Sequence, residues 1–439
     1  MLTRFVGIGL SGGRLGSGPV ATSRSRLGRP LPIAQEYGTW DRCSPGPAPA
    51  AACGWQHSAL QRQALEFDAL TVKIDDSGVS SPSVGNGSET TMYGGGSGER
   101  HTTADDGASE SASGEAPAEL LAMVDVELRP AALQMRQISR QFFPMTLEKL
   151  ALRRQMLAFM LPPLQADVPV REQRIPGRPQ GSEVGLWIVN ARAGATRPGI
   201  LHMHGGGFTA SSARGSVPHL QDVARKLDCV IVSVDFRNAP ETRHDGSLED
   251  NYTGLRWMYQ HAEALGVDRG RIAVMGESGG GGHAALLAIA ARDRGEIPLR
   301  FQALIYPMID DRTGSSRATP AHLGAFNWNP DANRFGWRCF LGEEPGTDRV
   351  PAAAVPARVE SVAGLPPTFI GVGALDLFVD ECITYARRLL EAGVPTELLV
   401  VPGCIHGFDL LSKEAGVSRR FTATKLDALR RAFGAGASA

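Results

Sequence analysis

The chain has 439 residues, of which 42% are hydrophobic, with a mean hydropathy of −0.13 and a formal net charge of −1. This length allows one large α/β domain with appendages, or two domains. The near-zero charge excludes a global attraction to nucleic acid or to an anionic membrane. No apolar run is long enough to span a bilayer. We therefore expect a soluble protein with no nucleic-acid partner and no stable membrane insertion.

The six cysteines are scattered, with no C-x-x-C pair and no Cys/His cluster at zinc spacing. In a chain of this length they indicate isolated thiols of a reducing compartment rather than a disulfide framework. We therefore predict a cytoplasmic protein without a metal site. The cysteines are Cys43, Cys53, Cys229, Cys339, Cys382 and Cys404.

Residues 1–117 do not have the composition of a packed domain. Arginines, serines and glycines are frequent before the first acidic residue, Glu36, which is typical of an organelle transit peptide. A disordered leader, or a start codon placed too far upstream, explains the same composition. Residues 77–117 are dominated by Gly, Ser, Thr, Asp and Glu and bury too little apolar surface to offset the entropy of folding. We predict a disordered leader over 1–117.

Residues 118–167 are predicted to form helices ahead of the main domain. Leucine and valine residues between 120 and 128 follow helical spacing, and Pro130 ends or restarts that helix. Thr146 can cap a second helix that runs through Met160. These helices could be plain packing elements, or they could cover an active site.

From residue 168 onward the chain alternates strands and helices. Several strands are apolar throughout, as expected for strands covered on both faces. The alternation predicts a mostly parallel, doubly wound α/β sheet over 168–439, with its first two strands antiparallel. Strands are expected at 168–175, 184–190, 198–203, 229–235, 271–275, 301–306, 368–373 and 397–401, and helices at 216–227, 247–265, 280–293, 377–392 and 413–433.

The sequence GESGG at 276–280 lies between a predicted strand and a predicted helix, and it matches G-x-S-x-G. In such a turn the glycines allow a tight connection, and the strained serine is lifted out at the carboxyl end of the sheet. A glycine turn can also be a simple connection or a phosphate cradle, but the Gly-Lys-Ser/Thr of a P-loop is absent. We predict that Ser278 is a nucleophile.

A second motif, HGGGF at 204–208, directly follows an apolar strand. Backbone amides of such a loop can stabilise the oxyanion formed in acyl transfer, because no side chain blocks their approach. The alternative is a flexible loop without a role, but the loop lies two strands upstream of the serine, where G-x-S-x-G hydrolases carry their oxyanion loop. We predict an oxyanion hole formed by the amides of Gly205, Gly206 and Gly279.

Two further residues follow the last two predicted strands: Asp376 and His406. Catalytic groups of open α/β sheets gather at this carboxyl edge. The other histidines lie in the leader, in helices or in polar loops, except His202, which is inside a strand and is expected to pack or to form a hydrogen bond. The order Ser278, Asp376, His406 is the nucleophile–acid–base order of α/β-hydrolases. We predict that these three residues form a catalytic triad.

Together these motifs resemble the hormone-sensitive-lipase branch of the α/β-hydrolases, which includes many bacterial carboxylesterases and acetyl-hydrolases. The resemblance covers about residues 118–435. It implies an α/β-hydrolase fold and a serine carboxylesterase for short- to medium-chain acyl esters that needs no cofactor; a homodimer is left open. It rests on HGGGF at 204–208, VDFRNAPE at 234–241, GESGG at 276–280, YPMIDDR at 306–312, GALD at 373–376 and HGF at 406–408.

The resemblance also implies a helical cap, formed by the N-terminal helices and by an insertion at about 311–350. Aromatic residues of the insertion could line an acyl pocket or form the core of the cap. These residues are Phe326, Trp328, Phe335, Trp337 and Phe340.

Some positions depart from the family pattern. Glu277 and Gly279 stand where members often have Asp and Ala, and Asn238 stands where they often have Leu. Gly279 can still donate its amide, but the glycine run through Gly282 is expected to loosen the oxyanion geometry. These departures remove no catalytic atom.

Two other functions are compatible with the same fold. An amidase or lactonase would use the same triad, since leaving-group choice depends on the shape of the pocket. A non-catalytic small-ligand-binding protein is the other alternative. The plant gibberellin receptors, which resemble this family, lack the triad histidine, so the presence of His406 argues against that reading.

Overall fold

The structure is a computed structural model that describes residues 117–178 and 180–434. The leader predicted over 1–117 therefore lies, apart from Pro117, outside the described residues. In the part of the chain that is described, no helix is long and apolar enough to cross a bilayer.

An eight-stranded sheet forms the centre of the described chain, with the strand order β1-β2-β4-β3-β5-β6-β7-β8. The pairs β1–β2 and β2–β4 are antiparallel and all others are parallel. The predicted fold class and the antiparallel start are therefore confirmed. The strands are β1 Val170–Pro176, β2 Glu183–Val189, β3 Arg197–Met203, β4 Val230–Asp235, β5 Val267–Glu277, β6 Phe301–Ile305, β7 Thr368–Gly373 and β8 Thr396–Val401.

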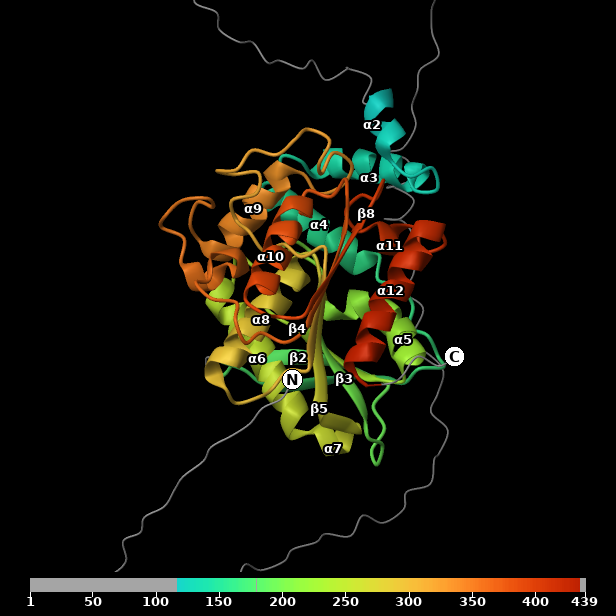
Figure 1. The fold of residues 1–439 in the computed structure, drawn as a ribbon, viewed down its shortest axis with the longest axis vertical. Coiled ribbons are helices and arrows are strands. Elements are labelled where there is room, and N and C mark those ends of the chain that lie inside the picture. Colours follow the sequence, from blue (N-terminus) through green and yellow to red (C-terminus); the bar gives the residue numbers. More distant parts are fainter. Residues whose placement is uncertain (1–116, 179, 435–439) are drawn as a thin grey trace, which may run out of the picture. The chain divides into compact units, whose positions relative to one another are not determined.

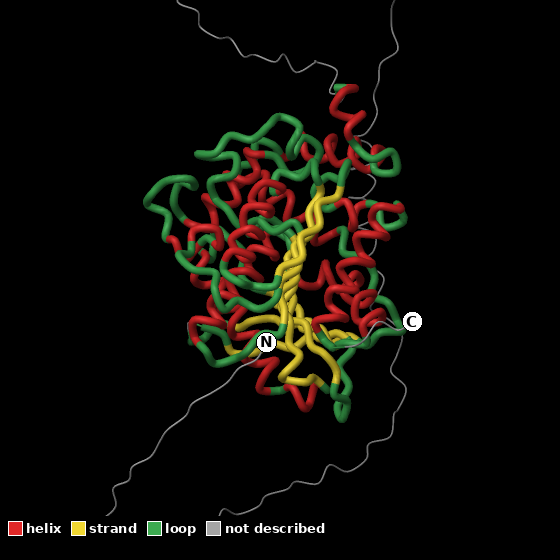
Figure 2. The backbone as a smooth tube through the Cα atoms, viewed as in Figure 1, coloured by secondary structure: helices red, strands yellow, loops and turns green. Residues whose placement is uncertain are grey.

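Helices cover both faces of this sheet, which Figure 2 shows nearly edge-on between two helical layers. Helices α5 and α12 pack together on one face, whereas α6 and α8 pack together on the other, where α10 covers β7 and β8. The central strands β3, β4, β6 and β7 are buried on both sides, which explains their continuous apolar runs. The helices of this part are α5 Ala213–Leu227, α6 His244–Gln260, α7 Ala262–Leu265, α8 Gly279–Arg294, α9 Pro330–Leu341, α10 Val379–Glu391, α11 Phe408–Leu411 and α12 Gly416–Ala432.

Three helices precede the sheet: α2 Ala118–Met123, α3 Arg129–Phe142 and α4 Leu147–Phe159. A continuous helix through residue 128 was the wrong expectation, because the chain becomes extended at Val124, where the amide of Asp125 donates to the carbonyl of Gly403. This contact with a distant loop overrides the local helical spacing. Pro130 restarts the helix in the first turn of α3. The predicted cap of α4 is confirmed, since Thr146 accepts a hydrogen bond from the Lys149 amide at 3.2 Å.

Candidate active site

Ser278 occupies a sharp turn between the end of β5 and the start of α8. Its backbone has φ 56° and ψ −123°, a region that residues with a side chain adopt only under strain. A Cβ at Gly276 would lie 2.2 Å from the carbonyl oxygen of Gly280, and a Cβ at Gly280 would lie 2.1 Å from that of Met203. Only glycine fits both positions, so the G-x-S-x-G spacing is a steric requirement of this turn.

The three residues predicted as a triad form one continuous chain of hydrogen bonds. Ser278 Oγ lies 2.9 Å from His406 Nε2, and His406 Nδ1 lies 2.7 Å from Asp376 Oδ2. A carboxylate only accepts hydrogen bonds, so Nδ1–H donates to Asp376 and Nε2 is left to accept from the serine hydroxyl. All three residues are buried, but Ser278 and His406 keep 8% and 7% of their surface exposed. The structure thus brings together the ends of β5, β7 and β8.

His406 is held by contacts that the sequence did not indicate. The rings of Tyr306 and Phe378 pack edge-on against its imidazole, with centroids 4.9 and 5.2 Å away. The side-chain amide of Asn327 donates to the carbonyl oxygen of His406 at 3.0 Å. These contacts fix both the backbone and the ring plane of the histidine.

Tyr306 is itself anchored in a buried polar cluster. Its hydroxyl donates to Asp409 Oδ1 at 2.8 Å, and Lys425 Nζ lies 3.2 Å from the other carboxylate oxygen. Burial, together with the charge of Asp409, raises the pKa of Tyr306 well above its ordinary value, so the hydroxyl remains a donor. Tyr306 belongs to the YPMIDDR motif, but no sequence signal pointed to Asp409 or Lys425.

The glycine loop after β3 lies against the serine turn. A Cβ placed on Gly205 would lie 3.6 Å from the Cβ of Ser278. Within the described residues, the amides of Gly205, Gly206 and Gly279 donate no hydrogen bond to another group. Gly279 is the first residue of α8, where an amide has no partner inside the helix. Gly205 and Gly279 therefore lie beside the serine, and none of the three predicted amides donates to a group of the described chain.

Gly279 also explains how closely the loop approaches the turn. A Cβ at this position would lie 2.8 Å from the amide nitrogen of Phe208 and 3.1 Å from that of Gly207. The four glycines from 279 to 282 form the buried first turn of α8. We expected the glycine run to loosen the oxyanion geometry, but the structure shows close packing here. Because Gly279 has no methyl group, the serine turn packs tightly against the backbone of the glycine loop.

A second Ser–His–acid chain lies directly beneath the serine turn. His202 Nε2 is 2.8 Å from Glu277 Oε2, and His202 Nδ1 is 2.8 Å from Ser233 Oγ. Burial opposes the charge on Glu277, but the charge and hydrogen bond of His202 outweigh it and lower the pKa of Glu277 to about 2. The predicted hydrogen-bonding role of His202 is confirmed. One of its partners, Glu277, is a residue that departs from the family pattern.

The aromatic residues of the insertion separate into two groups. Trp337 and Phe340 pack on Phe208, with ring centroids 4.9 and 4.0 Å away, and form a buried core. Trp328 instead lies against the glycine loop, where a Cβ at Gly207 would meet its ring at 2.2 Å. The core interpretation therefore fits Trp337 and Phe340, whereas Trp328 lies against Gly207 of the candidate oxyanion loop.

One arginine joins the N-terminal helices to this region. Arg154 of α4 donates to the carbonyl oxygens of Thr209 and Ala239, each at 2.7 Å. It also binds both carboxylate oxygens of Glu241, at 2.8 and 2.9 Å. Bidentate arginine–carboxylate pairs have a well-defined geometry, so α4 is fixed in place beside the glycine loop.

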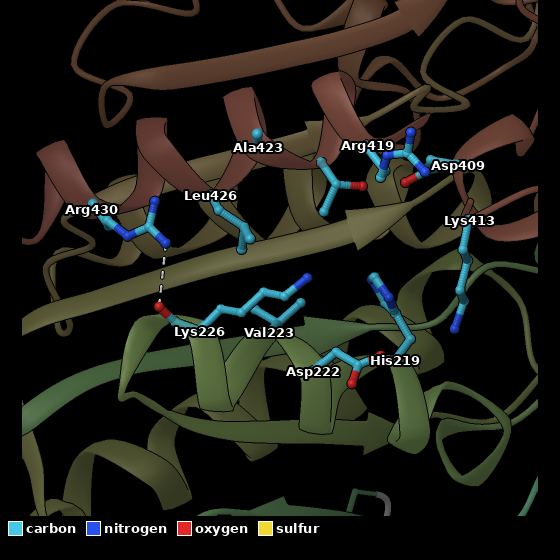
Figure 3. A pocket seen from close by; sticks show the side chains of 11 residues that line it. His219, Asp222, Val223, Lys226, Asp409, Lys413, Arg419, Ala423, Leu426 and Arg430 are labelled. Carbon is cyan, nitrogen blue, oxygen red and sulfur yellow. Dashed lines mark hydrogen bonds between the residues drawn. The ribbon is translucent and has the colours of Figure 1, made fainter. Parts of the chain in front are cut away.

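A separate cleft of about 360 Å³ lies between α5 and α12 (Figure 3) and contains none of the triad residues. His219 and Lys226 of α5 line one side, and Arg419 and Leu426 of α12 line the other. Asp409, which accepts the hydrogen bond of Tyr306, also lines this cleft. In the described part of the chain, no group of three or more His, Cys, Asp or Glu residues could hold a metal ion.

Comparison with known proteins gives a consistent result. A family model described as an alpha/beta hydrolase fold matches residues 200–410. Esterase LipI of Mycobacterium tuberculosis is 35% identical over 234 residues, which are 53% of this chain and 72% of that protein. Carboxylesterase NlhH of the same species is 34% identical over 245 residues, 54% of this chain and 74% of that protein. The solved structure of a bacterial heroin esterase is 36% identical, with a TM-score of 0.64, and covers 71% of this chain and 99% of that one.

The eight-stranded sheet and the serine turn define the class of the protein as an α/β-hydrolase. The chain belongs to the hormone-sensitive-lipase-like branch of this family, which confirms the resemblance seen in the motifs.

Proposed function

We propose that this protein is a serine carboxylesterase that hydrolyses short- to medium-chain acyl esters through an acyl-enzyme intermediate. The observation that carries the proposal is the hydrogen-bonded chain Ser278–His406–Asp376, together with the glycine amides that donate to no group of the described chain. The esterase relatives support ester bonds as the substrate.

In the first step, Ser278 Oγ attacks the ester carbonyl carbon while its proton passes to His406 Nε2. Asp376 accepts the Nδ1 hydrogen bond, holds the ring in this orientation and stabilises the imidazolium that forms. The carbonyl oxygen gains negative charge and accepts hydrogen bonds from the candidate oxyanion amides. His406 then gives its proton to the alkoxide oxygen, the carbon–oxygen bond breaks, and the alcohol leaves.

In the second step, water replaces the alcohol. His406 takes a proton from the water as the oxygen attacks the acyl carbon, and then returns a proton to Ser278 Oγ as the acyl bond breaks. The carboxylic acid leaves and the resting state is restored. Each amide of the oxyanion hole can contribute about 10²–10³ to the rate.

The preference for short to medium acyl chains is supported by the crowding near the glycine loop. The ring of Trp328 contacts Gly207, and Phe143 packs edge-on against Trp328 with centroids 6.5 Å apart. We propose that these bulky rings limit the length of the acyl chain that the site accepts.

The test is a matched panel of p-nitrophenyl esters of increasing acyl length, the corresponding anilides and a set of lactones. We expect turnover of acetate and butyrate esters, decreasing for long chains, and fluorophosphonate labelling that disappears in Ser278→Ala. Hydrolysis of the anilides or lactones alone would identify an amidase or lactonase. A protein that binds these esters without turnover or labelling would be a ligand-binding member of the fold.

A further inference from the structure

A buried pair of opposite charges lies close to the candidate triad. Lys425 of α12 is completely buried and Asp409 of α11 is 3% exposed, with Lys425 Nζ 3.2 Å from Asp409 Oδ2. Lysine is almost never fully buried. Removing two charges from water costs about as much free energy as their attraction returns, so apolar side chains could stabilise the fold equally well. The pair therefore points to a role other than stability.

One tyrosine joins this pair to the histidine of the candidate triad. Asp409 Oδ1 accepts a hydrogen bond from the Tyr306 hydroxyl at 2.8 Å, and the Tyr306 ring packs edge-on against the imidazole of His406, with centroids 4.9 Å apart. The backbone of Tyr306 has φ 35°, in the left-handed region that bulky residues avoid. Such strain persists only where the surrounding contacts fix the residue. The Tyr306 ring is therefore held at both ends while it packs on His406.

Helix α12 also holds the loop that carries His406. This loop leads directly into α11, where Asp409 lies three residues after His406. The Ser418 hydroxyl donates to the carbonyl oxygen of Phe408 at 3.3 Å, and the Phe421 ring packs against that of Phe408 with centroids 4.9 Å apart. The same helix thus fixes the backbone beside this histidine as well as the charged pair.

A second tyrosine–carboxylate–cation cluster lies far from the triad. The Tyr252 hydroxyl donates to Glu296 Oε2 at 2.6 Å, and the guanidinium of Arg294 lies 3.9 Å from the centroid of the Tyr252 ring. Arg294 is the last residue of α8, whereas Ser278 immediately precedes that helix. The 16 residues of α8 span about 24 Å. This cluster therefore offers a matched control, in which the same kind of contact is remote from the nucleophile.

We propose that Asp409 and Lys425 are positioning residues of the active site. By fixing the hydroxyl of Tyr306, they keep the imidazole of His406 aligned with its two triad partners. Neither residue contacts the reacting atoms, so their influence passes through the tyrosine ring. The effect on turnover rests on the proposed function, whereas the alignment of the imidazole does not.

The first test compares two substitutions that each remove one buried hydroxyl. Tyr306→Phe should lower kcat for p-nitrophenyl butyrate by about tenfold with little change in KM, because a misplacement of about 1 Å can cost about 10²-fold. Tyr252→Phe should lose a comparable amount of stability towards urea, since its hydroxyl also binds a carboxylate, and keep kcat within about twofold of the wild type. A wild-type kcat in Tyr306→Phe, with stability reduced as in Tyr252→Phe, would overturn the proposal.

The charged pair is tested without leaving one charge unpaired in the core. Asp409→Leu/Lys425→Met removes both charges together, which avoids the destabilisation that follows the loss of one partner. This double variant should lower kcat as Tyr306→Phe does, because the tyrosine loses its acceptor. Asp409→Asn/Lys425→Met restores an oxygen acceptor and should recover part of the lost kcat. If the two double variants had equal kcat, the hydrogen bond between Asp409 and Tyr306 would not be the anchor.

Proton NMR measures the alignment of the imidazole independently of turnover. The Nδ1 proton of His406, in its 2.7 Å hydrogen bond to Asp376, is expected to give a downfield resonance that depends on the geometry of this bond. The resonance should shift or broaden in Tyr306→Phe and keep its wild-type position in Tyr252→Phe. An unchanged resonance in Tyr306→Phe would contradict the positioning role. If the resonance responded in this way but the wild type hydrolysed no ester, the proposed function would be refuted and the positioning role would stand.

Discussion

Two Ser–His–acid chains lie next to each other in this protein, and their hydrogen bonds are almost equal in length. Ser278–His406–Asp376 has distances of 2.9 and 2.7 Å. Ser233–His202–Glu277 has two distances of 2.8 Å. In the first chain the acid contacts Nδ1 of the histidine and the serine contacts Nε2. In the second chain the acid contacts Nε2 and the serine contacts Nδ1. Residue types and distances alone therefore do not distinguish a catalytic arrangement from a structural one.

The backbone around each serine makes the difference. Ser278 stands in a strained turn and keeps 8% of its surface exposed, beside amides that donate to no group of the described chain. Ser233 is completely buried in β4, which pairs with β2 on one side and β3 on the other. The neighbouring amides are therefore used in the sheet, and no substrate carbonyl can reach the hydroxyl. We interpret the second chain as a support beneath the serine turn, and four predictions test this comparison.

The largest expected effect separates the two serines. Ser278→Ala should lower kcat/KM for p-nitrophenyl butyrate by at least about 10⁴-fold, because the nucleophile is lost. Ser233→Ala should lower it by less than about tenfold. Steady-state kinetics on folded protein, checked by circular dichroism, measures both. If the two substitutions were equally harmful, the distinction between the chains would be wrong.

The two acids should differ in the same way. Asp376→Asn should reduce kcat by about 10³–10⁴-fold. The amide no longer favours the tautomer of His406 in which Nδ1 carries the proton and Nε2 accepts from Ser278. Glu277→Gln should reduce kcat by less than about tenfold, because its carboxyl group contacts His202 and not His406. The measurement is kcat for both variants under saturating ester. A full loss of kcat in Glu277→Gln would place that residue in the catalytic machinery.

Gly279→Ala tests the contact between the serine turn and the glycine loop. The new Cβ would lie 2.8 Å from the amide nitrogen of Phe208, so the loop must move away from the oxyanion position. We expect kcat to fall by about 10–10²-fold with little change in KM. Gly270→Ala, on the preceding strand β5, is the control, because a Cβ there meets only the flexible side chain of Asp268 at 3.3 Å. Equal kcat in both variants would contradict a tight oxyanion loop.

The smallest effect concerns stability and pH. The pKa of Glu277 in the folded protein, about 2, lies below its ordinary value of 4.5, so the ionised group stabilises the fold above about pH 4.5. This contribution is lost as the pH falls from about 4.5 to about 2. Glu277→Gln should lower the free energy of unfolding by about 2–3 kcal/mol at pH 7 and by much less below pH 3. Urea unfolding at several pH values measures it, and a difference independent of pH would refute the ion-pair origin.

Much of the site was predictable because its determinants are local. The glycine spacing at 276–280 specifies the serine turn, and the glycine loop follows directly from an apolar strand. Asp376 and His406 were found because parallel strands bring their carboxyl ends to one edge of the sheet. The end of the first helix at Met123, before Pro130, was not predicted, since it depends on a hydrogen bond from Asp125 to the distant Gly403.

The amino-acid sequence by itself determined the alternation of strands and helices, the strained turn at Ser278 and the chain order of the triad, because these depend on short stretches of backbone and side-chain chemistry. Only the tertiary structure decided which Ser–His–acid chain is accessible and which lies in the core. It also decided that Arg154 meets Glu241, 87 residues away, and that His202 meets Glu277, 75 residues away. Such pairings depend on which strands become neighbours and on how helices pack over them, and these relations are set by the folded chain as a whole.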